Sequence, residues 1–371
     1  MRQLTFQRTI GAGAFGTVYQ AELQTGRGFR KQVAVKVIQA RGPDGDIFLS
    51  RIRDEARLLG LLQDDAILKV LDMVQIDGLD AVVMEYIEGV DLDSIVKHAG
   101  APSPQALAEL AALVAGALHR AHTAIHPNSG TPLGVVHRDV KPANIMVTRS
   151  GGVRLLDFGV AKARFEARES YTGQLVLGTL NYMAPEYIVS NQLSPAADIY
   201  GLGLSVYEAA TGKVYGQPKV RADGHNKRLA ERMAELAETM PALAPVVQAM
   251  LAWQPEERPD GAEAERLLWE VSGGSRGPSL RAWATQAVPQ ILSGREVAPD
   301  GPGLLGRTVQ LAEEAAVPEA EAQLVDSGSR DSVESMPPPG KATAPMQAAS
   351  PGLPPTTRGT PPPTPPQAPP Q

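Results

Sequence analysis

Glycines 11, 13 and 16 form the first pattern in the chain that points to a particular chemistry. Gly11, Gly13 and Gly16 lie in the stretch GAGAFGTV. Positions without a side chain let backbone N–H groups approach phosphate oxygens closely. Dinucleotide-binding folds use the same spacing, but there the glycines lead from a strand into a helix. Here GTVYQAEL alternates like a strand, so we expect a loop between two strands that covers a nucleotide. An ordinary glycine turn is the competing interpretation.

The next apolar strand, VAVK, ends on Lys36. A lysine at such a position is usually solvated unless an acidic residue holds it. Glu55, on the helix predicted to follow, can pair with it and hold its ammonium group on the α- and β-phosphates of a nucleotide. Asp54 is the rival partner. We favour Glu55 because it lies four residues before Leu59, beside the apolar stripe of the helix.

Two polar stretches follow in order, HRDVKPAN at residues 137–144 and DFG at residues 157–159. Each has an ordinary structural interpretation by itself, since DFG is a common turn tripeptide and HRD can be a surface ion pair. With the glycines and Lys36, at these spacings, they resemble the protein kinase family. The resemblance spans about residues 6–271 and includes all the main motifs of that family in order.

The resemblance implies roles in phosphoryl transfer for four polar residues. Asp139 would accept the proton of the substrate hydroxyl and align its oxygen for in-line attack. Lys141 would neutralise charge on the transferred group. Asn144 and Asp157 would hold two Mg²⁺ ions, or Mn²⁺ in their place, against the phosphates of ATP. Such chemistry depends on positioning and charge neutralisation more than on covalent steps.

The same resemblance favours serine and threonine as the phosphorylated residues. Lys141, two residues after Asp139, is usual in serine/threonine kinases. Thr179, in GTLNYMAPE, would hydrogen-bond the catalytic loop, which is again typical of that class. Two structural roles are implied as well. Asp198 would orient the catalytic loop through its backbone, and Glu186 would pair with Arg258.

For the adenine ring, the resemblance implies a pocket with Met84 at its back and a hinge at residues 85–87. Apolar side chains would sandwich the ring. By spacing alone Ile145 or Val147 could replace Met146 in this role, and ordinary core packing is the alternative for all of these positions. The predicted nucleotide-binding residues are Gly11, Ala12, Gly13, Ala14, Phe15, Gly16, Val18, Ala34, Lys36, Glu85, Ile87 and Met146.

Arg138, directly before Asp139, suggests a form of regulation. In related kinases such an arginine often anchors a phosphorylated activation loop. The corresponding loop, residues 157–186, carries several hydroxyl groups. We predict autophosphorylation near Thr172, with new arginine–phosphate contacts that order the loop. The hydroxyl-bearing candidates are Ser170, Tyr171, Thr172 and Thr179.

The elements that must position these residues divide the chain into halves. Short strand-like runs dominate to about residue 87, and Ser103 with Pro104 predicts the start of a long alanine-rich helix. This order predicts an α+β, two-lobed kinase fold, with a small β-rich lobe at about residues 1–87 and a large helical lobe at about 88–272. Residues 211–241 look short and charged, so we expect the substrate-side helix of the large lobe to be trimmed.

After about residue 272 the pattern weakens. We predict a linker over residues 273–326 whose amphipathic pieces, LRAWATQAV and RTVQLAEEAA, either dock or stay mobile. Residues 327–371 are rich in proline and are predicted to be a disordered tail. The tail could bind the aromatic-lined groove of a partner domain or act as a solvated linker.

Composition narrows the functional classes. The 371 residues carry a formal net charge of −6, too mild to indicate nucleic-acid binding, and contain no cysteine, which excludes disulfides and thiolate metal sites. No segment reaches the roughly 20 apolar residues of a membrane span, so we expect a cytoplasmic protein. His119, His122 and His126 recur at helical spacing, but no carboxylate or cysteine joins them, and we favour structural roles over a metal site.

The predicted function is that of a soluble, bacterial, eukaryotic-like protein kinase, which transfers the γ-phosphoryl group of ATP to serine or threonine of protein substrates. A pseudokinase usually lacks one of Lys36, Asp139 and Asp157, all of which are present. Small-molecule kinases lack the GTLNYMAPE segment and the DFG form. A scaffold that acts through the C-terminal region stays open as an alternative.

Overall fold

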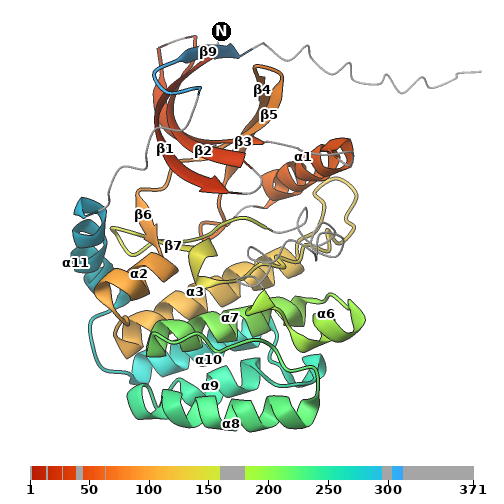
Figure 1. Cartoon of the computed structure of the whole chain (residues 1–371), viewed down its shortest axis with the longest axis vertical. Helices are drawn as coiled ribbons and strands as arrows, with labels where there is room; N and C mark the ends of the chain where they lie inside the picture. The colour runs from red at the N-terminus through yellow and green to blue at the C-terminus, as the bar shows by residue number, and fades with distance from the viewer. Residues whose placement is uncertain are drawn as a thin grey trace, which may run out of the picture. The chain divides into compact units, whose positions relative to one another are not determined.

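The computed structural model describes residues 2–13, 16–26, 28–38, 45–62, 64–158, 180–294 and 303–311, except for the side chains of residues 45–48, 51 and 55. All of these residues belong to one compact unit, residues 1–315. A small lobe built on a β-sheet and a large helical lobe make up this unit (Figure 1). The predicted α+β, two-lobed architecture is confirmed. The predicted tail, residues 327–371, lies outside the described residues.

An antiparallel sheet forms the small lobe. Its strands lie in the order β4-β5-β3-β2-β1-β9, and helix α1, Gly45–Leu61, contacts β4 beside it (Figure 1). The first five strands come from the region predicted to be strand-rich, whereas β9 comes from the predicted linker. The strands are β1 Arg2–Gly13, β2 Gly16–Gln24, β3 Arg30–Ile38, β4 Val70–Ile76, β5 Leu79–Glu85 and β9 Thr308–Leu311.

Strand β3 shows how the sheet positions its polar chemistry. Val33 and Val35 lie in an apolar cluster on one face of the sheet. Ala34 and Ile38 lie in a second cluster on the other face, which includes side chains of α1. Because side chains alternate along a strand, Lys36 shares the face of Ala34 and Ile38. The strand therefore carries the lysine on the same side as the predicted adenine-contacting alanine.

The large lobe is organised around α3, Pro104–His122. Ser103 accepts a hydrogen bond from the Ala106 N–H, and Pro104 occupies the first helical position, as predicted. Helices α7 and α10 pack against α3 (Figure 1). No described helix combines the length and apolar content of a bilayer span. The other helices are α2 Leu92–Ala99, α6 Pro185–Ser190, α7 Pro195–Thr211, α8 Ala222–Thr239, α9 Ala244–Met250, α10 Gly261–Gly274 and α11 Leu280–Ser293.

The expectation of a trimmed helix within residues 211–241 is wrong. Helix α8 has 18 residues in this stretch. Its buried side chains are His225, Leu229, Met233 and Leu236, a single stripe at spacings of four and three residues. The rest of its surface is largely charged or otherwise polar and faces water. A narrow apolar stripe suffices here because only one side of the helix packs against the lobe.

A second, three-stranded sheet borders the segments with the polar motifs. Its order is β6-β7-β8, with β6 at Gly89–Asp91, β7 at Ile145–Thr148 and β8 at Val153–Leu155. The HRDVKPAN stretch immediately precedes β7, and the DFG stretch follows β8. Because β7 and β8 form a hairpin, these two stretches lie at the same end of it.

Two pieces of the predicted linker are ordered parts of the compact unit. The LRAWATQAV piece lies within α11, which contacts α2, α3, β6 and β7 of the large lobe. Part of the RTVQLAEEAA piece forms β9, which pairs with β1 of the small lobe. The sequence left open whether these pieces dock or stay mobile, and the described parts of both pieces dock. The boundaries at residues 272 and 326 stay a prediction.

Candidate active site

The glycine stretch lies at the hairpin between β1 and β2, where Gly13 pairs with Gly16. A loop between two strands is the predicted arrangement and differs from the strand-to-helix turn of dinucleotide-binding folds. Gly16 has φ +141°, and a Cβ there would lie 2.0 Å from the Val37 carbonyl oxygen. The fold itself therefore requires a glycine at this position. Ala14 and Phe15 lie outside the described residues.

The other two glycines have no such structural demand. A Cβ on Gly13 would meet no atom within 4 Å, and one on Gly11 would make only ordinary contact with Val18. Glycine at these positions, with Ala12 between them, leaves the backbone of β1 open to a ligand. Phosphate oxygens need such an open backbone if they are to approach its N–H groups closely.

Lys36 and Asp157 meet across the site. The Lys36 Nζ lies 2.8 Å from Asp157 Oδ1, although the residues come from β3 and from the segment after β8. Asp157 adopts the left-handed backbone conformation with φ 49°. The Glu55 side chain lies outside the described residues, so its pairing with Lys36 stays a prediction. The rival Asp54 is exposed on α1 and faces Arg57.

Asp139 lies at the centre of a hydrogen-bonded group. Its carboxylate accepts hydrogen bonds from Lys141 Nζ at 3.0 Å and from Asn144 Nδ2 at 2.8 Å. The same Asn144 nitrogen also donates to the Asp139 backbone carbonyl at 2.8 Å. A 3₁₀ turn at Pro142–Asn144 folds the chain back so that these side chains can meet. With only 4% of its surface exposed, Asp139 is held rigidly in one orientation.

His137 is neutral and fixes the two motif stretches to each other. Its Nε2 donates to the Leu156 carbonyl at 2.9 Å, and its Nδ1 accepts from the Asp139 N–H at 3.2 Å. A ring with one donor and one acceptor is neutral, and burial lowers the pKa of His137. Phe158 of the DFG stretch packs on the imidazole, with ring centroids 4.4 Å apart.

Asp198, in α7, holds the backbone of the same loop. Its carboxylate accepts hydrogen bonds from the His137 and Arg138 N–H groups, both at 2.7 Å, so the predicted role of Asp198 is confirmed. His122 Nε2 lies 2.8 Å from the same carboxylate. Arg138 adopts φ 70°, and its buried Nε has no partner among the described residues. The two backbone hydrogen bonds hold Arg138 in this strained conformation.

The three histidines thus serve different partners. His122 contacts Asp198, and His126 Nδ1 accepts from the N–H groups of the turn that follows it. His119 lies where α3 meets the start of α10, close to Gly261. No cluster of three or more His, Cys, Asp or Glu side chains placed to hold a metal ion is found in the described part of the chain. Sequence reasoning did not predict the contact of His122 with Asp198, although the family resemblance favoured a structural histidine near this place.

The predicted pair of Glu186 and Arg258 is confirmed. The two guanidinium nitrogens Nη1 and Nη2 donate to the two carboxylate oxygens at 2.8 Å each. The remaining N–H groups of Arg258 donate to three backbone carbonyls. All five guanidinium donors are therefore used, and the guanidinium also stacks over the Tyr200 ring at 4.7 Å. The pair ties α6 to the segment before α10.

The predicted adenine-contacting residues come from both lobes. Val18 and Ala34 lie with Met84 in the apolar cluster on the face of the small-lobe sheet that also carries Lys36. Met146 in β7 is half-buried, whereas Ile145 and Val147 are buried in the core of the large lobe. Of the three candidates in β7, only Met146 therefore keeps an accessible side chain.

The hinge follows β5. The Glu85 N–H donates to the Lys69 carbonyl at 3.0 Å, so this group is occupied. No described residue hydrogen-bonds the backbone of Ile87, which leaves both of its polar groups able to meet an adenine edge. Among the predicted hinge residues, Ile87 is thus the better candidate for a base contact through its N–H.

Tyr182 and Glu208 form a contact that sequence reasoning missed. The Tyr182 hydroxyl donates to Glu208 Oε2 between the segment before α6 and helix α7. The two residues are 26 positions apart, and no local pattern links them. Burial raises the pKa of Glu208, and the Tyr182 hydrogen bond opposes that rise. Ionised Glu208 is therefore less favourable in the folded chain than in the unfolded one.

This raised pKa predicts a pH dependence of stability. Between the ordinary glutamate pKa and the raised value, the folded chain binds more protons than the unfolded one, so its stability falls as pH rises through that window. The Glu208→Gln variant should lose this fall. Unfolding free energies measured at a series of pH values should show the wild type losing stability relative to the variant across this window, with a constant difference above it. Parallel curves across the window would contradict the prediction.

Gly201 in α7 lies directly beneath the catalytic loop. A Cβ there would come within 2.9 Å of the Val140 carbonyl oxygen. We expect Gly201→Ala to displace the loop that carries Asp139 and to lower kcat by roughly 10-fold to 100-fold, since small misplacements are costly in catalysis. Steady-state kinetics test this. Gly224→Ala in α8, where a Cβ would make only ordinary contact with the Lys219 side chain, is the matched control and should keep wild-type kcat. A normal kcat in both variants would contradict the prediction.

The chain belongs to the protein kinase family, because the family model described as "Protein kinase domain" matches residues 4–269. Among curated relatives, the probable serine/threonine-protein kinase pknA2 of Bifidobacterium longum is 33% identical over 84% of this chain and 40% of its own length. PknA of Mycobacterium tuberculosis is 38% identical over 56% of this chain and 46% of its own length.

Solved structures agree on the fold. The PknI kinase domain of M. tuberculosis has a TM-score of 0.53 and 25% identity, over 73% of this chain and 96% of that domain. The alignments with the two curated relatives span less than half of each relative's length. The family is thereby established for this chain, and its homologues are bacterial serine/threonine kinases.

Proposed function

We propose that this chain is a serine/threonine protein kinase that transfers the γ-phosphoryl group of ATP to proteins. The observation that supports this most directly is the hydrogen-bonded group around Asp139, which joins its carboxylate to Lys141 and Asn144. The Lys36–Asp157 contact lies on the same site. A pseudokinase has no use for this complete set of polar groups.

The donor set fits a magnesium–nucleotide complex. Asp157 and Asn144 supply carboxylate and amide oxygens, which are hard ligands of the kind Mg²⁺ prefers. The bound ion would supply positive charge to the phosphate oxygens. We assign Asn144 and Asp157 to the metal, Lys36 with Glu55 to the α- and β-phosphates, and the open backbone of Gly11 and Gly13 to phosphate binding.

The remaining steps belong to the catalytic loop. Asp139 accepts the proton of the substrate hydroxyl and fixes the direction of its oxygen, because the loop holds its carboxylate rigidly. The Lys141 ammonium, 3.0 Å from that carboxylate, neutralises charge on the transferred group. Burial of this pair limits screening by water and strengthens the effect.

Lys141 carries the preference for serine and threonine over tyrosine. Thr179, the second residue behind this preference, lies outside the described residues. The activation-loop hydroxyls Ser170, Tyr171 and Thr172 lie outside them too. The buried Nε of Arg138, without a partner among the described residues, supports the proposal that a phosphate on this loop contacts Arg138.

Phosphoamino-acid analysis after incubation with labelled ATP and Mg²⁺ tests the proposal. We expect phosphoserine or phosphothreonine from wild type and no label with Lys36→Met. Label that persists in Lys36→Met would contradict the enzyme assignment, and phosphotyrosine as the main product would contradict the residue preference. In the same experiment, mass spectrometry should find phosphate between residues 165 and 180; its absence from active protein would contradict the loop proposal.

A further inference from the structure

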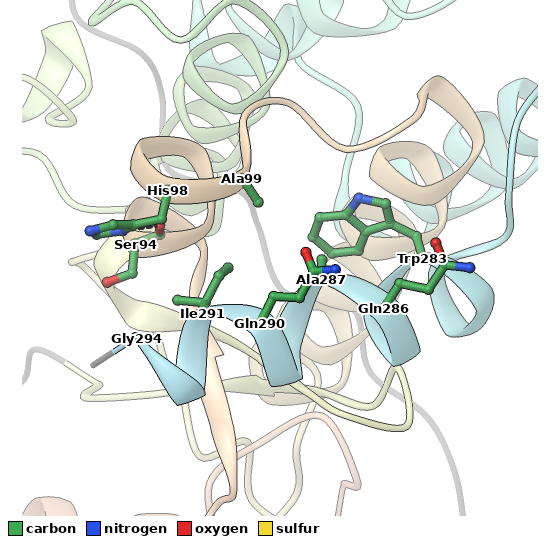
Figure 2. Close-up of a pocket in the computed structure, with 9 residues that line it drawn as sticks. All are labelled: Ser94, His98, Ala99, Trp283, Gln286, Ala287, Gln290, Ile291 and Gly294. Carbon is green, nitrogen blue, oxygen red and sulfur yellow. Dashed lines mark hydrogen bonds between the residues drawn. The ribbon is translucent and has the colours of Figure 1, made fainter. Parts of the chain in front are cut away.

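Helix α11, which lies beyond the matched family region, docks on the large lobe through a continuous apolar stripe. Its stripe residues are buried at spacings of three and four positions. Figure 2 shows the part of the helix next to α2, where Trp283 and Gln290 of α11 and His98 of α2 are among the residues that line a pocket of about 580 Å³. The apolar stripe makes the contact with the large lobe, and the pocket lies at the edge of this contact. The stripe consists of Leu280, Ala284, Ala287, Val288 and Ile291.

Polar contacts fasten the chain that leads into α11. The Leu280 N–H donates to Glu109 Oε2 of α3 at 2.7 Å, and Ser103 Oγ donates to the Pro278 carbonyl at 2.8 Å. A Cβ on Gly151 would come within 2.6 Å of the Arg281 backbone, so the turn after β7 receives α11 closely. These specific contacts fix the position of α11 on the lobe.

The other end of the segment is built into the small lobe. Strand β9 pairs antiparallel with β1 from Arg2–Leu311 to Thr5–Thr308. Two further backbone hydrogen bonds, both 3.0 Å, join Phe6 to the turn before β9. Leu304 and Leu311 are buried in the same cluster as the core side chains of β1. Arg307 also pairs with Asp77 at the β4–β5 turn.

Each docking place lies on an element that leads to the nucleotide site. Helix α11 contacts β6, Gly89–Asp91, which begins two residues after the hinge residue Ile87. Strand β9 extends the sheet along β1, whose far end carries Gly11 and Gly13. The segment that contains both elements therefore joins the strand of the glycine loop to the strand after the hinge.

We propose that residues 278–311 form a strap, a second covalent connection between the lobes that narrows the range of their relative positions around the nucleotide. The eight residues between Gly294 and Gly303 can span at most about 30 Å, at roughly 3.3–3.6 Å per residue, so the strap sets an upper limit on the separation of its two docked ends. A tethered strand also rebinds from a high effective concentration, which keeps β9 on β1. The link to nucleotide affinity rests on the proposed kinase function; the restriction of lobe motion does not.

Interlobe distances test the strap independently of activity. The chain has no cysteine, so spin labels attach only to cysteines that are introduced. We introduce Lys31→Cys on the small lobe and Glu238→Cys on the large lobe, both at exposed positions. A protease recognition sequence is inserted between Gly294 and Gly303 of the full chain. Cutting it should broaden the label–label distance distribution and raise KM for ATP by roughly fivefold or more. An unchanged distribution would overturn the proposal, and the same site placed after residue 315 is the control cut.

A second pair of variants undocks β9 without a cut. Leu311 is buried, whereas Gln310, its neighbour in β9, is exposed. Leu311→Asp should broaden the distances as cutting does, and Gln310→Asp should not. If Leu311→Asp lowered the thermal stability but kept the wild-type label–label distances, the strap proposal would be overturned. Strand β9 would then only cover the small-lobe core. If wild type transfers no phosphate, the proposed function fails, and the distance measurement still decides the strap.

Discussion

Asp139→Asn should lower kcat for substrate phosphorylation by about 10²–10⁴-fold, the usual contribution of a positioned general base. The asparagine side chain has nearly the same shape, and its one amide oxygen can still accept a hydrogen bond from Lys141 or Asn144. Its amide nitrogen cannot accept the proton of the substrate hydroxyl, and it repels one of those donors. We therefore expect a folded protein with almost no catalysis.

The measurement is steady-state phosphorylation of a protein or peptide substrate, accompanied by a thermal unfolding curve for each variant. Asp223→Asn is the matched control, because Asp223 is exposed on α8 beside Arg221 and the substitution is chemically identical. The control should keep wild-type kcat. If Asp139→Asn kept a tenth or more of the wild-type kcat, as an order-of-magnitude threshold, the role of Asp139 would be refuted.

Arg258→Met should cost about 3–5 kcal/mol of unfolding free energy, because removing one partner of a buried ion pair leaves the other charge uncompensated. The Arg258 side chain has no exposed surface, and Glu186 is nearly as buried. Three backbone carbonyls would also lose their donors. Methionine can replace much of the side-chain volume but none of these hydrogen bonds.

Denaturant unfolding of wild type and variant gives this difference directly. Arg266→Met is the matched control, because the ion pairs of Arg266 with Glu263 and Glu270 lie on the exposed side of α10 and such pairs contribute little. A double variant that adds Glu186→Met should cost less than the sum of the single changes, since it leaves no unpaired charge. A small loss from Arg258→Met, equal to that of the control, would refute the buried-pair argument.

Local patterns in the sequence were enough to predict several elements of the fold. Ser103 and Pro104 start α3 because a capping side chain and a preset proline φ act within one turn. Alternation along β3 places Lys36 and Ala34 on one face for a similarly local reason. The α8 prediction was wrong because a charge-rich stretch can still be a full helix when a single stripe of side chains packs.

The motif residues and the family could also be read from the sequence, since each motif is a short run whose residue types state its chemistry. The pairs that join distant segments were of two kinds. Glu186 with Arg258 followed from the family resemblance, and the structure added the five satisfied donors. Tyr182 with Glu208 followed from nothing local, because the two meet only once α7 has packed beneath the segment before α6.

What the sequence by itself determined is therefore the chemistry: the identity and order of Lys36, Asp139, Lys141, Asn144 and Asp157, and the α+β plan that carries them. Only the tertiary structure decided how the C-terminal pieces are used. The four residues of β9 have too little apolar pattern to form a strand alone, and they become one because the edge of β1 supplies backbone partners. Pairing between segments some 300 positions apart depends on a finished edge, which no local run of residues can encode.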